Sequence, residues 1–361
     1  MNARRRAALV RAFLLLLALL ALSRLIRGHD LRQALALIRR VGWPLGLVVV
    51  PTLVAMGLDA AGWGGILLAL GTRVRWVRML ELRLSVEALV LLLPGGSVAG
   101  EAAKMALLNR RAGVPLPRAV ASLALTKGYL VATDGAYLAL AAVWAALDAE
   151  AAGGSPFSLP ALGAAACAVA MGLLGWLLLA SLRHAAIASR IAALLQKIPI
   201  LRLRRAIAER ERGFAQIDSE ARAFFAAPAA RRWRPLLAFF LEWLMEGIET
   251  LIIVRCLRLP LPIGPVLALD ALGSLLRVIV FFLPAGLGVQ DAAIILLLRQ
   301  MGLPNPVAAG TALILVKRAK ELFWIAAGTV FLLIRGDLRR AATLGPAPGP
   351  PPDRSLRPGS P

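Results

Sequence analysis

Charged side chains stand inside the long apolar stretches of this sequence. Lys127 and Lys317 each lie about ten residues inside such a stretch, and Glu242, Glu246 and Glu249 follow one another at the spacing of a single helix face. A charge at the centre of a membrane span costs about 2.5–3.5 kcal/mol, so it normally faces a cavity, a partner or a ligand. A desolvated lysine near a helix N-terminus suits a phosphate group. These residues therefore predict a site for a charged group inside a membrane.

Two helix-breaking turns lie close to these charges. The segments LLLPGGSVAGEAAKMALL (91–108) and FFLPAGLGVQDAAIILLL (281–298) align without gaps, with Pro94 on Pro284 and Glu101 on Asp291, 190 residues apart. The same offset pairs other unusual residues: Trp43 with Trp233, Gly57 with Gly247, Asp59 with Glu249, and Lys127 with Lys317. Chance matches of Trp, Pro and in-membrane charges are much rarer than chance matches of Ala and Leu. The pattern therefore predicts an internal duplication.

Interrupted helices leave backbone N–H and C=O groups free for a ligand, a common design of substrate sites in secondary transporters. The candidate binding residues are the turn glycines and the charges around them: Gly95, Gly96, Glu101, Lys104, Lys127, Glu246, Glu249, Gly286, Gly288, Asp291, Lys317 and Lys320.

Purely structural roles stay open for the same residues. Glu101 and Asp291 sit just past the turns, where a carboxylate can act as a helix cap. The two lysines can snorkel, or pair with Asp59 or Glu249. The glutamate face can form ion pairs with basic residues of the last apolar run, which are Lys317, Arg318 and Lys320.

Motifs of common enzyme classes are absent from the sequence. There is no HExxH, no GxSxG, no phosphate-binding Walker loop and no paired Asp-rich motif for magnesium. The two histidines, His29 and His184, lie outside the apolar runs, and Cys167 and Cys256 form no CxxC pair. We expect no enzymatic activity, no metal and no cofactor.

Composition places the chain in a membrane. Of its 361 residues 59% are hydrophobic and 17% are charged, and the mean hydropathy is +0.75. Apolar runs that predict about six full spans cover residues 7–26, 45–70, 119–147, 160–182, 235–257 and 307–334. The net charge of +22 comes mostly from segments between the runs, as the positive-inside rule expects, so nucleic-acid binding is not expected.

Two shorter apolar segments predict re-entrant helical hairpins. Residues 84–93 span about 15 Å as a helix, half a bilayer, before the Pro-Gly-Gly turn and a returning arm at 100–108. Residues 264–283 lead into the second turn, although 20 residues could also cross completely. The distribution of basic residues places both termini in the cytoplasm and gives the two hairpins opposite orientations, which makes the duplication an inverted repeat.

These segments give an all-α polytopic fold with one transmembrane domain over residues 1–335. Repeat one covers about 43–147, a cytoplasmic amphipathic linker about 183–234, and repeat two about 233–334. Residues 31–41 predict a surface-lying amphipathic helix on the outer side. The Pro-rich tail at 345–361 predicts disorder.

The two turn segments, LLLPGGSVAGEAAKMALLNRRAGVPLPRAVAS and FFLPAGLGVQDAAIILLLRQMGLP, resemble the paired Pro-Gly motifs of the lysylphosphatidylglycerol synthase transmembrane-region family. This family comprises flippase-like membrane proteins and includes hopanoid-associated members. The resemblance covers roughly residues 10–335. Asp291, preceded by Gln290, stands where the second motif usually has a glutamate.

The resemblance implies movement of a lipid or isoprenoid lipid across the cytoplasmic membrane. We therefore expect a flippase or transporter for an anionic, aminoacylated or isoprenoid lipid, and no aminoacyl transfer, because only about 25 residues follow the last predicted span. The alternative is a non-transporting lipid-binding scaffold subunit of a biosynthetic complex. The expected partners are a membrane lipid and, for the scaffold, a lipid-biosynthetic enzyme.

Overall fold

The computed structural model describes residues 28–92, 96–184, 187–196, 211–279 and 289–334, and within these ranges it contains helices and no strand. The first half consists of α2 (Gly28–Val41), the short 3-10 helix η1 (Trp43–Val48), α3 (Val49–Ala69), α4 (Trp76–Leu92), α5 (Gly96–Ala112) and α6 (Leu116–Ala151). The second half consists of α7 (Leu159–His184), α8 (Ile187–Gln196), α10 (Glu211–Ala226), α11 (Ala229–Cys256), α12 (Ile263–Ile279), α13 (Val289–Gln300) and α14 (Pro306–Ile334). The chain is an all-α polytopic membrane protein, as predicted.

Three helical segments are long and apolar enough to cross a membrane: Trp43–Ala69, Leu116–Ala151 and Pro160–His184. Helices α11 and α14, with 28 and 29 residues, each reach about 42 Å and carry the predicted in-span charges. The predicted first span at 7–26 and the tail at 345–361 lie outside the described residues.

The two Pro-Gly turns join helices that pack against each other, α4 with α5 and α12 with α13. Helix α4 begins at Trp76, so the predicted arm at 84–93 starts about two turns too late. The indole of Trp76 donates to the carbonyl of Gly57 at 2.9 Å, which ties this added part of the helix to α3. The 17 residues of α4 and of α5 each measure about 25 Å, more than the half-bilayer arms predicted.

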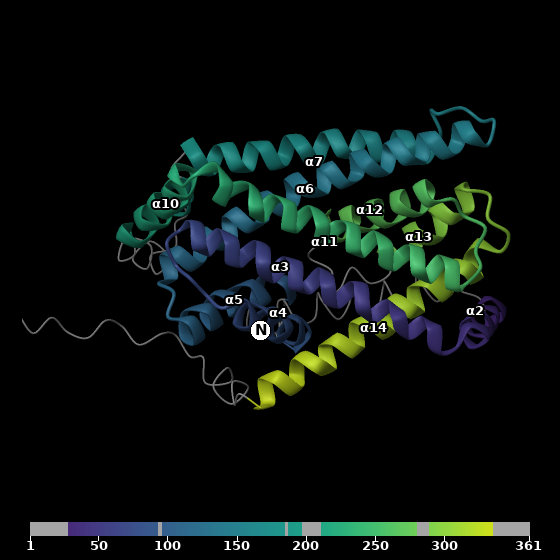
Figure 1. The fold of residues 1–361 in the computed structure, drawn as a ribbon, viewed down its shortest axis with the longest axis horizontal. Coiled ribbons are helices and arrows are strands. Elements are labelled where there is room, and N and C mark those ends of the chain that lie inside the picture. The colour runs from purple at the N-terminus through teal and green to yellow at the C-terminus, as the bar shows by residue number, and fades with distance from the viewer. Residues whose placement is uncertain (1–27, 93–95, 185–186, 197–210, 280–288, 335–361) are drawn as a thin grey trace, which may run out of the picture.

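The four helices α3, α4, α5 and α6 of the first half correspond, in this order, to α11, α12, α13 and α14 of the second half. Helix α6 begins at Leu116 and α14 at Pro306, 190 residues later. Figure 1 shows α3 and α11 side by side and running in opposite directions. The first arm of each hairpin packs on the other half, α12 on α6 and α4 on α14, whereas the returning arms α5 and α13 pack on α6 and α14 of their own halves.

Different elements form the two ends of the long axis of the assembly. Figure 1 shows α10 at the opposite end of the long axis from α2 and from the turn between α6 and α7. Helix α10 buries Phe224 against Tyr129 of α6, with ring centroids 5.7 Å apart, and Glu220 forms a two-pronged ion pair with Arg118 at 2.9 Å. The described part of the predicted linker is thus docked on the helix bundle.

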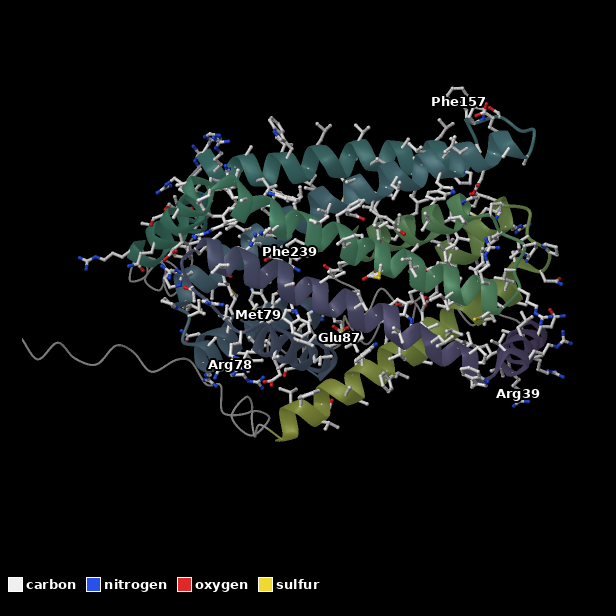
Figure 2. The ribbon with its side chains drawn as sticks, in the orientation of Figure 1. Arg39, Arg78, Met79, Glu87, Phe157 and Phe239 are labelled. Carbon is white, nitrogen blue, oxygen red and sulfur yellow. The ribbon has the colours of Figure 1, made fainter. Side chains whose placement is uncertain are left out.

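Helix α2 is the amphipathic helix expected at 31–41. It buries Ala34 against the core that includes α14, and it leaves Arg39 and Arg40 exposed. Figure 2 shows Arg39 and Phe157 toward the same end of the assembly.

Candidate functional site

A group of charges occupies the middle of the bundle where α3, α4, α5 and α6 meet. The guanidinium of Arg83 lies 2.6 Å from Asp59 and also pairs with Glu87, one turn along α4. Asp59 is 4% exposed, and its Oδ1 has no hydrogen-bond partner among the described residues. Figure 2 places Glu87 in the interior, away from both ends of the long axis. We call Asp59, Arg83, Glu87, Glu101, Lys104, Lys127 and Glu242 the central charge cluster.

Two lysines of this cluster have contrasting surroundings. Lys104 is 6% exposed, and its ammonium lies 4.4 Å from the ring centroid of Trp63, a cation–π contact. The indole of Trp63 is itself fixed by donating to Ser122 at 3.1 Å. Lys127 pairs with Glu101, yet half of the Lys127 side chain is exposed. Lys127 is therefore the cation of this cluster that a ligand can reach most easily.

Glu242 differs from the other acids of the cluster. Its Oε2 is buried without a hydrogen-bond partner, and among the described residues the side chain makes neither a hydrogen bond nor an ion pair. Arg83 and Lys104 attract this carboxylate, whereas Asp59 and Glu246 repel it. Glu242 thus carries an acceptor group without a donor inside an apolar bundle.

Glu249 lies beside the central cluster on α11, and its carboxylate accepts three hydrogen bonds from two donor groups. The ammonium of Lys320 on α14 lies 2.7 Å and 2.8 Å from its two oxygens, and the hydroxyl of Thr52 on α3 donates to Oε2 at 2.7 Å. Glu249 is 1% exposed, so this arrangement supplies the partners that burial of a carboxylate requires.

Asp270 on α12 is a second buried carboxylate with hydrogen-bond donors for both of its oxygens. Its Oδ1 accepts from Lys317 at 2.7 Å and from Thr250 at 2.5 Å, and its Oδ2 accepts from Tyr137 at 3.3 Å. The predicted pairing of Glu249 with Lys317 is wrong, because Glu249 binds Lys320 and Lys317 binds Asp270. The general expectation that this glutamate face pairs with the basic residues of the last span is correct for Glu249.

Asp291 and Glu101, the equivalent acids of the two hairpins, are both paired with the last helix of their half. Asp291 lies in the first turn of α13 and accepts from Arg318 at 3.0 Å, whereas Glu101 lies in the second turn of α5 and pairs with Lys127. The prediction that Glu101 caps the returning helix is therefore wrong, and the alternative pairings of Lys127 with Asp59 or Glu249 are replaced by the one with Glu101. Arg318 also binds Glu321 at 2.7 Å.

The structure brings together only part of the predicted site. Glu101, Lys104 and Lys127 belong to one cluster, whereas Glu249 with Lys320, Lys317 and Asp291 lie in neighbouring pairs. Glu246 lies on α11 between Glu242 and Glu249. Gly96 is the first residue of α5. Gly95, Gly286 and Gly288 lie outside the described residues.

Two partners were not among the predicted site residues. Arg83 on α4 is enclosed beside Asp59, with a quarter of its side chain exposed. The spacing of Arg83 and Glu87, four residues apart in an apolar segment, is the signal that could have identified it. Asp270 interrupts the apolar segment 264–283, and a charge there should have been counted as a candidate.

The described residues contain no group of three or more His, Cys, Asp or Glu side chains arranged to hold a metal ion. What they contain is a set of ion pairs in each half, which join helices of the same half, with one accessible lysine and several unsatisfied carboxylate oxygens. Such an arrangement can bind a charged group and can exchange protons.

A family model described as "Lysylphosphatidylglycerol synthase TM region" matches residues 9–316. A search of curated proteins gives no match.

Proposed function

The chain belongs to the lysylphosphatidylglycerol synthase TM region family, and from this membership we propose that it is a lipid flippase or transporter. Membership indicates a membrane protein with a lipid-related function. The proposed activity is movement of an anionic, aminoacylated or isoprenoid lipid across the cytoplasmic membrane, without making or breaking a covalent bond.

The observation that carries this proposal is the half-exposed Lys127 beside two enclosed cations. Lys127 is held by Glu101, and Lys104 and Arg83 belong to the same cluster. A phosphate that replaces Glu101 as the partner of Lys127 gains a charge-assisted contact in a low-dielectric environment. The acyl or isoprenoid chains stay in the surrounding lipid, because only the headgroup has to cross the apolar layer.

The arrangement of the helices supports transport through an inverted repeat. Corresponding helices α3 and α11 run in opposite directions (Figure 1), and the first arm of each hairpin packs on the last helix of the other half. Rocking of one repeat against the other around a fixed site is the usual route to alternating access in such folds. The hydrogen bond of Thr52 with Glu249 and that of Tyr137 with Asp270 join helices of different halves, which such rocking would shift.

We propose that the end carrying α10 faces the cytoplasm. This end exposes arginines of α10 and of the start of α11, including Arg222, Arg231 and Arg234. At the other end, the last turn of α6 and the connection to α7 carry Asp148 and Glu150 and no Lys or Arg. Together with the span predicted at 7–26, this orientation agrees with the prediction that both termini are cytoplasmic.

Reconstituted vesicles test the proposal. Purified protein should move fluorescent phospholipids, aminoacyl lipids or polyprenyl phosphates between leaflets faster than protein-free vesicles, as measured by chemical quenching of the outer leaflet. The transporter proposal fails if no lipid of this panel, extended to hopanoids, moves faster than in empty vesicles. The non-transporting scaffold would then be the better interpretation.

A further inference from the structure

Glu242 has the environment of a proton-binding group. Glu249 has two donor groups and Asp270 has three, but Glu242 makes no hydrogen bond and no ion pair among the described residues. Burial of an unpaired carboxylate is so unfavourable that the group normally takes up a proton instead. Because no described residue donates a hydrogen bond to Glu242, we expect its carboxylate to take up a proton from outside the protein.

The charged groups around Glu242 come from several helices. Asp59 of α3 and Glu246 of α11 repel its negative charge, and Arg83 of α4 and Lys104 of α5 attract it. The cations on the other helices around the site are engaged elsewhere: Lys127 of α6 with Glu101, Lys317 of α14 with Asp270 of α12, and Lys320 of α14 with Glu249. No cation among the described residues is therefore directly bound to Glu242.

Two more carboxylate oxygens of the central charge cluster lack a partner. Asp59 Oδ1 and Glu101 Oε2 are buried and have no hydrogen-bond donor among the described residues, as is true of Glu242 Oε2. An oxygen of an ionised carboxylate can only accept a hydrogen bond, so these three buried oxygens of one cluster lack hydrogen-bond donors. A proton converts one such oxygen into a hydrogen-bond donor, so it is a ligand that fits this lack of donors.

We propose that Glu242 binds a proton that crosses the membrane together with an anionic lipid headgroup, so that the proton gradient drives the transport. The inference rests on the proposed lipid transport and adds its energy source. The carboxylate of Glu242 takes one proton from water on one side, becomes a neutral carboxylic acid, and returns that proton to water on the other side. No electron is transferred and no other bond changes.

Proton binding and headgroup binding are coupled because the carboxylate of Glu242 and the phosphate compete for the same two cations, Arg83 and Lys104. Neutral Glu242 no longer attracts Arg83 and Lys104, so their positive charge is available to a phosphate. Ionised Glu242 attracts them again and weakens the hold on the headgroup. Proton and anion therefore bind together and leave together.

A stability measurement tests the proton site without any transport. Glu242→Gln keeps the size of the side chain and removes the acid. An exposed glutamate loses its proton near pH 4.3, at about its ordinary pKa. If the folded wild type keeps this proton at higher pH, its stability falls as the pH rises from about 5 to 8, by about 2–4 °C in thermal midpoint relative to the variant. Glu150→Gln, an exposed acid at the end of α6, should follow the wild type.

A transport measurement tests the coupling. Vesicles contain labelled phosphatidylglycerol, whose phosphate does not titrate near neutral pH, and a difference of one pH unit is imposed across the membrane. One proton per headgroup predicts a steady leaflet ratio of about ten for the wild type, because one pH unit is a tenfold gradient. The lipid should accumulate in the leaflet facing the higher pH. Glu242→Gln should give a ratio near one, and Glu150→Gln should match the wild type.

The outcomes separate this inference from the proposed function. Lipid movement in the wild type with a leaflet ratio that ignores the pH gradient overturns the coupling and leaves the transporter intact. Identical pH profiles of thermal stability for the wild type and Glu242→Gln overturn the proton site. Absence of lipid movement together with a shifted stability profile contradicts the transporter while keeping Glu242 as a proton-binding residue.

Discussion

The ammonium of Lys320 lies 2.7 Å and 2.8 Å from the two carboxylate oxygens of Glu249, and this pair joins α14 to α11. Both side chains are enclosed, with 17% and 2% of their surface exposed. A pair of this kind holds the two helices at a fixed register, because each partner is costly to leave alone in an apolar interior.

Removing one partner of this pair should destabilise the protein strongly. We expect Lys320→Met to cost about 3–5 kcal/mol, because it leaves the buried carboxylate of Glu249 with Thr52 as its only donor. The double variant Lys320→Met with Glu249→Gln should recover most of this loss. The free energy of unfolding in detergent measures both effects, and additive losses in the double variant would contradict a direct pair.

Lys317 should behave as the partner of Asp270. Lys317→Met should destabilise the protein, although less than Lys320→Met, because Asp270 keeps the hydroxyl donors of Thr250 and Tyr137. Adding Asp270→Asn should restore stability, whereas adding Glu249→Gln should not. Rescue of Lys317→Met by Glu249→Gln instead would restore the pairing predicted from the sequence. The free energy of unfolding in detergent measures these effects as well.

Lys127 should matter for transport more than for folding. Its side chain is half exposed, so Lys127→Gln should leave the thermal midpoint nearly unchanged. Loss of a charged contact to a headgroup, about 1.5–3 kcal/mol, should slow lipid movement by about 10- to 100-fold. Arg222→Gln on the exposed face of α10 is the matched control. Equal rates for the two variants would remove Lys127 from the headgroup site.

Close contact between α6 and α7 depends on a glycine. A methyl group at Gly175 would lie 2.5 Å from backbone atoms of Ala132, whereas one at Gly163 on the same helix meets nothing within 4 Å. We expect Gly175→Ala to destabilise by about 1–3 kcal/mol through overpacking. Gly163→Ala should be neutral or stabilising by about 0.5–1 kcal/mol. Equal thermal midpoints of the two variants would show that α7 shifts freely over α6.

The opposite orientation of the two hairpins can be tested by cysteine labelling. Arg110 and Gln300 are 190 residues apart, exposed, and near the ends of α5 and α13. After replacement of the native Cys167 and Cys256 by alanine, a cysteine at Arg110 should react from the cytoplasmic side and one at Gln300 from the outer side. Labelling of both from one side would contradict the inverted repeat.

Several elements of this protein could be predicted from the sequence because their signals are local. Apolar length predicts the membrane helices, and the match at an offset of 190 residues predicts that α6 and α14 begin at equivalent positions. The exposed arginines and buried Ala34 of α2 follow from the helical periodicity of that segment. The start of α4 could not be predicted as well, because hydropathy falls at its charged residues while the helix continues.

The partners of the buried charges were decided by the tertiary structure. The sequence places Lys317, Arg318 and Lys320 within one helical turn, and it places Glu249 and Asp270 on separate segments. Helix crossing then brings Lys320 to Glu249, Lys317 to Asp270 and Arg318 to Asp291, and it leaves Glu242 unpaired among the described residues. Side-chain pairing depends on differences in helix rotation and height of a few ångströms, which the one-dimensional pattern of charges does not contain.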